Sequence, residues 1–112
     1  MRDDREWLQD ILEAIENIER YGAKGKTTFE MDELVQTWII HHLQIIGEAG
    51  NKISDSLRQN YSQVPWAQII AMRNILVHEY FGLDLEEIWS AVQRDLPALK
   101  IQIENLLDTL EG

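Results

Sequence analysis

Apolar residues recur at steps of three and four along four stretches of the chain, and no stretch alternates apolar and polar residues as a half-buried strand would. This spacing places the apolar side chains on one face of a helix. With 112 residues, 45% of them hydrophobic, the chain has the length of one domain and needs no metal or disulfide to fold. We therefore expect residues 1–112 to form a single all-α domain, an up-and-down four-helix bundle.

Capping patterns predict where the first two helices begin. Asp3 and Glu6 form a capping box ahead of the first apolar stripe, and Gly22 is typical of a helix C-terminus. Thr27 and Glu30 repeat the capping pattern ahead of the second stripe. The sequence therefore predicts one helix that ends at Gly22 and a second that begins near Thr27.

The second apolar stripe is long and runs to Ile53, with a break near Gly50 as the alternative. Gly47 and Gly50 lie within it, and each costs about 1 kcal/mol relative to alanine in a helix. We expect these glycines to allow another backbone to approach closely.

The third helix is predicted over 65–81, because a proline suits its first position and a glycine follows directly after it. Asp84 and Glu87 cap the last helix, which continues to the end of the chain. Pro97 lies inside this helix and should kink it.

The charge of the chain is unevenly distributed. Ten basic and twenty acidic residues give a net charge of -10, which excludes a general DNA-coating role. The acidic excess lies in residues 1–21 and 84–112, so the nearly neutral middle of the chain can still hold a local anion site.

Zero cysteines exclude a thiolate metal site and a cysteine nucleophile, and they fit a reducing compartment. Polar residues interrupt the longest apolar block, and no signal peptide is evident, so we expect a cytoplasmic protein with no membrane partner.

Arg73 lies in the middle of the apolar stripe of the third helix, where a leucine would be expected. Desolvating a guanidinium is costly unless it is paired. Arg73 should therefore either meet an acidic residue such as Glu48 or line a solvated cleft that binds anions.

A second copy of the chain would bring Arg73 and His78 together. The two residues are five positions apart and so point about 140 degrees apart on one helix. Asn74 and His78 share a face with the small residues Ala67 and Ala71, along which a second copy of the helix could approach. A two-fold homodimer would gather both faces in one cleft.

The residues of this cleft suit RNA cleavage by the RNA's own 2′-hydroxyl group. His78 can move protons near neutral pH, and Arg73 can stabilise the charge that develops on the phosphate. His41 and His42 are neighbours that diverge on a helix, and no ligand stands at the spacing of a metal site. We therefore expect neither a metal nor any other cofactor.

The arrangement Arg73-x-x-x-x-His78-x-Tyr80, with Asn74 directly after the arginine, resembles the signature of the HEPN superfamily, specifically the HepT-like toxins. The resemblance covers nearly the whole chain and extends to three flanking segments, Ile46-Gly-Glu-Ala-Gly50, Pro65-Trp66 and Gly82-Leu-Asp84.

The resemblance implies a helical-bundle dimer that acts as a metal-independent RNase toxin and is neutralised by a nucleotidyltransferase antitoxin of the MNT family. It assigns Arg73 and His78 to the RNase centre, Asn74 to the polar position that supports it, and Tyr80 to the side chain that the antitoxin AMPylates. By spacing alone, Tyr80 shares the face of Arg73, since seven residues make nearly two turns.

Two other functions use the same residues or ignore them. In a noncatalytic nucleotide-binding or regulatory dimer, Arg73 and His78 would hold a nucleotide and the protein would regulate a partner nucleotidyltransferase. A purely structural helical dimer leaves Arg73 unexplained. Cleavage of RNA by the purified protein separates the first function from both alternatives.

Overall fold

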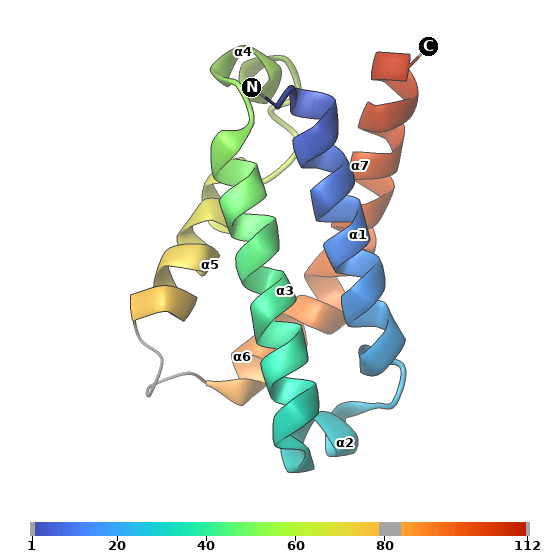
Figure 1. Cartoon of the computed structure of the whole chain (residues 1–112), viewed down its shortest axis with the longest axis vertical. Coiled ribbons are helices and arrows are strands. Elements are labelled where there is room, and N and C mark those ends of the chain that lie inside the picture. The colour runs from blue at the N-terminus through green and yellow to red at the C-terminus, as the bar shows by residue number, and fades with distance from the viewer. Residues whose placement is uncertain (1, 79–83, 112) are drawn as a thin grey trace.

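The computed structural model describes residues 2–78 and 84–111, without the side chains of Met72 and of residues 74–78 (Figure 1). Within these ranges the regular structure is entirely helical, which confirms the predicted all-α class. The four longer helices are α1 (Asp4–Gly22), α3 (Glu33–Lys52), α5 (Trp66–His78) and α7 (Leu96–Glu111). The short ones are α2 (Lys26–Met31), α4 (Asp55–Asn60) and α6 (Leu85–Ser90).

Helix α3 is central to the packing. It lies along α1 on one side and along α5 on the other, and α7 packs against α1 (Figure 1). In the same view α1 and α5 run in one direction and α3 and α7 in the other. The core lies where the apolar faces of α1, α3 and α7 meet, and its fully buried side chains include Leu8, Ile11, Ile15, Ile18, Phe29, Ile39, Leu43 and Ile103.

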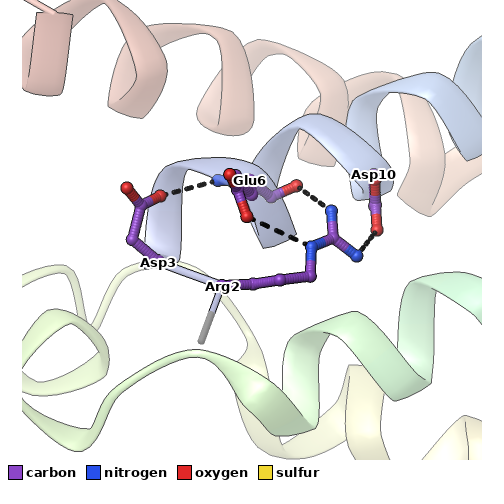
Figure 2. A network of polar contacts seen from close by, with 4 residues as sticks. All are labelled: Arg2, Asp3, Glu6 and Asp10. Atoms are coloured by element: carbon purple, nitrogen blue, oxygen red, sulfur yellow. Dashed lines mark hydrogen bonds and ion pairs between the residues drawn. The ribbon is translucent and has the colours of Figure 1, made fainter.

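The N-terminus of α1 is fixed by two polar side chains. The Asp3 carboxylate accepts a hydrogen bond from the Glu6 backbone N–H at 3.1 Å, which confirms Asp3 as the cap. The Glu6 carboxylate instead accepts from the Arg2 guanidinium, which also donates to Asp10 at 2.7 Å (Figure 2). The hydrogen bond to Asp10 raises the pKa of Arg2 above its ordinary value. Helix α1 ends at Gly22, as predicted.

The prediction of one long second helix from Thr27 is wrong, because Asp32 divides it. Asp32 is in an extended conformation and its carboxylate accepts from the N–H groups of Leu34 and Val35, which makes it the N-cap of α3. The Gln36 amide donates to two carbonyls at the end of α2 and so fixes the corner. Helix α3 runs without a break through Gly50 and ends at Lys52, one residue before Ile53, so the predicted end is confirmed and the alternative break near Gly50 is wrong.

Helix α5 begins at Trp66, one residue after the predicted start at Pro65, whereas its expected end at 81 and the glycine that follows lie outside the described residues. Asp84 caps α6, accepting from the N–H groups of Glu86 and Glu87.

The expected kink at Pro97 takes the form of a π-helical segment, Ala91–Asp95, between α6 and α7. A proline ring collides with the carbonyl group four residues before it, here that of Gln93, and the wider turn makes room for the ring. None of the described helices is both long enough and apolar enough to cross a membrane.

Candidate functional site

The site begins at the contact between α3 and α5, where a glycine of one helix faces an arginine of the other. A Cβ atom on Gly47 would lie 3.1 Å from the Arg73 Cα atom and closer still to the Arg73 Cβ atom. One turn away, a Cβ atom on Gly50 would lie 3.1 Å from the Ile69 Cγ2 atom. The predicted close approach of another backbone is confirmed at Gly47, where it brings the base of Arg73 against α3, whereas at Gly50 the nearest atoms belong to a side chain.

Arg73 is both paired and open to solvent. Its Nε atom lies 3.9 Å from the Glu48 Oε1 atom, which confirms Glu48 as an acidic partner. The side chains are 35% exposed for Arg73 and 58% exposed for Glu48. At this distance the pair is electrostatic and is longer than a hydrogen bond. The guanidinium therefore lies near α3, in a side chain that is partly exposed to solvent.

The other motif residues are placed less completely. Asn74 and His78 lie in α5, but their side chains are not among those described, and Tyr80 lies outside the described residues. Helix α5 runs without a break from Trp66 to His78, so the backbone positions of Arg73 and His78 keep the separation of about 140 degrees that helical geometry dictates. One copy of α5 thus presents the two residues on different faces.

The outer face of α5 carries small exposed residues. Ala67 and Ala71 are exposed, whereas Ile69 on the opposite side is buried against α3. This face borders a shallow hollow of about 780 Å³ lined also by Trp66, Ile70 and side chains of α4, among them Arg58 and Gln59. The face that sequence analysis assigned to a second copy is therefore unoccupied within one chain at the described positions.

A second hollow, of about 500 Å³, lies between α1 and α3. Its lining includes the carboxylates of Asp10, Glu13 and Glu48 and the imidazole of His42. The lining also includes Arg2, whose guanidinium is bound to Asp10, so three carboxylates share the hollow with one guanidinium. The α1 side of Glu48 is thus acidic and disfavours a phosphate.

His42, which the sequence suggested only as a possible metal ligand, has a structural role that no local pattern indicates. His42 is 7% exposed and its Nδ1–H donates to the Trp38 carbonyl oxygen at 2.7 Å. Its ring packs on the Trp38 ring with centroids 4.4 Å apart. Among the described residues, no three His, Asp or Glu side chains gather as a group that could hold a metal ion.

Comparison with known proteins places the chain in a family. Residues 11–106 match the family model described as Ribonuclease HepT-like. A protein of Methanocaldococcus jannaschii, "Gamma-glutamylcyclotransferase and putative RNase MJ0434", is 38% identical over 98% of the chain, and the chain spans half of that relative's length. "Probable ribonuclease HepT" of Thermococcus cleftensis is 37% identical over 94% of the chain and 96% of its own length.

A third relative, "Putative RNase TTE0752" of Caldanaerobacter subterraneus, is 34% identical over 96% of each chain. No solved structure gave a significant match. The chain belongs to the HepT-like ribonuclease family. This membership confirms the family expected from the motif and the enzyme class, ribonuclease.

Proposed function

We propose that this chain is the toxin of a HEPN/MNT toxin–antitoxin pair, a metal-independent endoribonuclease whose reaction centre combines Arg73 and His78 from two copies of the chain. The observation that carries the proposal is Arg73 itself. In a HepT-like chain, the motif arginine lies partly exposed on a helix that meets its neighbour at a glycine. A site of this kind suits the binding of a phosphate.

In the proposed reaction, the 2′-oxygen of a ribose attacks the adjacent phosphorus atom and the bond to the 5′-oxygen of the next nucleotide breaks. His78 acts as acid or base: a proton leaves the 2′-hydroxyl and a proton reaches the departing 5′-oxygen. Arg73 stabilises the extra negative charge on the phosphoryl oxygens in the transition state. The products are a 2′,3′-cyclic phosphate and a free 5′-hydroxyl. Asn74, next to Arg73, is the polar residue that supports this centre.

The proposal includes an up-and-down four-helix bundle that forms a homodimer through α5. The apolar residues of α5 are distributed around the helix, which is typical of a helix that is buried on all sides, yet α5 packs mainly on α3 within one chain. A second copy would cover the outer face and place His78 of one copy near Arg73 of the other.

For regulation, we propose that an MNT-type nucleotidyltransferase transfers AMP from ATP to the Tyr80 hydroxyl oxygen in the cytoplasm, with loss of the hydroxyl proton and release of pyrophosphate. An AMP group on Tyr80 would bring a phosphodiester charge and a nucleoside to the face of Arg73, where both compete with RNA. Residue spacing and family membership support this step.

The proposal is tested by incubating the purified protein with total RNA beside Arg73→Ala and His78→Ala variants. We expect the unmodified protein to cleave RNA and both variants to lose cleavage while they keep the helical circular dichroism of the parent. Full activity in the His78→Ala variant contradicts the mechanism. Binding of RNA without cleavage by the unmodified protein favours a noncatalytic regulatory dimer.

A further inference from the structure

Glu48 lies outside the Arg73–His78–Tyr80 motif, but the structure places it beside Arg73. It directly follows Gly47, so two successive residues of α3 meet Arg73: the glycine meets its Cα and Cβ atoms, and the carboxylate meets its guanidinium. The first contact fixes where the Arg73 side chain leaves α5. The contact with the Glu48 carboxylate attracts the guanidinium of Arg73 toward α3.

We propose that Glu48 is a positioning residue for Arg73 in RNA cleavage, an inference that rests on the proposed function. The Glu48 carboxylate lies 3.9 Å from the Nε atom of Arg73. Nε is on the stem side of the guanidinium, so a carboxylate there restrains the direction in which the group points from α5.

The charges around Glu48 determine from which side a phosphate can approach Arg73. Glu48 also lines the acidic hollow between α1 and α3, together with Asp10 and Glu13. A phosphate is repelled from that side and approaches Arg73 from the side of α5 that faces away from α1. Glu48 therefore lies on the opposite side of the guanidinium from the approaching RNA. This placement explains why an enzyme for a polyanion keeps a carboxylate beside the residue that binds the anion.

The proposal predicts opposite changes in binding and in turnover. Removing a negative charge near the RNA strengthens binding or leaves it unchanged, because repulsion falls. If Glu48 positions Arg73, the same change lowers kcat, because the guanidinium no longer meets the transition state in the correct orientation. A role in simple charge repulsion would instead raise affinity and leave kcat unchanged.

The experiment compares Glu48→Gln, Glu48→Asp and the parent protein for kcat on an RNA substrate, and for affinity on the same RNA with a 2′-deoxy group at the cleavage position. We expect Glu48→Gln to lower kcat about 10-fold with equal or tighter RNA binding, and Glu48→Asp to recover most of the loss because it keeps the charge. The control is Glu13→Gln, which removes the same charge from the same hollow. Within the described part of the chain no ion pair joins Glu13 to Arg73, so kcat should not change.

The proposal is overturned if Glu48→Gln keeps the kcat of the parent, or if Glu48→Asp loses as much kcat as Glu48→Gln. Circular dichroism and sedimentation show whether each variant keeps its fold and assembly. A parent protein that cleaves no RNA overturns the proposed function itself. The two failures are therefore distinguishable.

Discussion

Gly47 and Arg73 are in contact across the interface of α3 and α5, with no room between them for a methyl group. The backbone of α3 itself forms the surface on which the base of the arginine side chain rests. The position of a guanidinium in the candidate site is thus linked to the distance between two helices.

Replacing Gly47 by alanine should separate α3 from α5. The added Cβ atom would lie 3.1 Å from the Arg73 Cα atom, so backbone has to move. We expect the free energy of unfolding to fall by about 1–3 kcal/mol, as for other overpacked cores, and RNA cleavage to fall with it. Urea unfolding measures the first effect.

Gly22→Ala is the matched control, because its Cβ atom would lie 3.5 Å from the Val92 Cγ1 atom, an ordinary contact. Equal free energies of unfolding for the two variants would contradict the prediction, because α3 and α5 could then move apart without loss of stability.

Asp4 and Ser54 join the start of α1 to the junction of α3 and α4. The Asp4 carboxylate accepts from the Ser54 N–H at 2.8 Å and from the Ser54 hydroxyl at 2.5 Å, and the same hydroxyl oxygen accepts from the Leu57 N–H. Asp4→Ala leaves these donors without their acceptor and should lower the free energy of unfolding by about 1–3 kcal/mol. Thermal unfolding of Asp4→Ala beside Asp108→Ala, an exposed carboxylate of α7, tests this. A loss no larger than that of the control contradicts it.

The outer face of α5 should hold the homodimer together. Ala71 is small and exposed on this face, so Ala71→Arg introduces bulk and a charge that a second copy cannot accommodate. Sedimentation at micromolar concentration should give a dimer for the parent and a monomer for this variant. Ala23→Arg, exposed at the end of α1, should remain a dimer. A monomeric parent protein would remove the composite site.

RNA cleavage should persist in the presence of excess chelator. The proposed centre moves protons through His78 and stabilises charge through Arg73, and neither role needs a divalent ion. The measurement is the rate of cleavage of one RNA with and without chelator, with a metal-dependent nuclease as the positive control for chelation. Loss of activity that returns on addition of a divalent metal would sink the metal-independent mechanism.

Co-expression with an MNT-type nucleotidyltransferase should add AMP to Tyr80 and abolish RNA cleavage. Intact mass gives the number of adenylyl groups and peptide mapping gives their position. The Tyr80→Phe variant should escape modification, whereas Tyr21→Phe should be modified like the parent. If a fully neutralised complex holds unmodified Tyr80, inhibition works by steric binding instead.

Local signals predicted much of the fold. Asp3 and Asp84 are caps whose side chains bond to nearby N–H groups, so a few residues contain all the information needed. The corner at Asp32 was missed because Thr27 and Glu30 match the capping-box pattern better than Asp32 does, whereas the structure uses Asp32 as the N-cap of α3. The bond between Asp4 and Ser54 joins residues fifty positions apart, which no local pattern reveals.

The candidate site was also predicted only as far as local sequence signals reach. A charged residue inside an apolar stripe identifies Arg73, and two helical glycines predict a close approach, since both signals are local. That Gly47 and Arg73 face each other depends on how α3 and α5 pack, which only the structure shows. His42 was misjudged because burial against Trp38 is a tertiary property.

The π-helical segment Ala91–Asp95 also has a consequence for chain length. A π-helical turn holds about one residue more than an α-helical turn, so the segment takes up one extra residue without turning the faces of α6 and α7 away from each other. Trp89 before the segment and Leu99 after it are both buried. Deleting one residue of the segment would give a regular α-helix with the same buried faces, and the Pro97 ring would then collide with the carbonyl group four residues before it. The extra residue thus provides the space that a proline needs inside a continuous helical region.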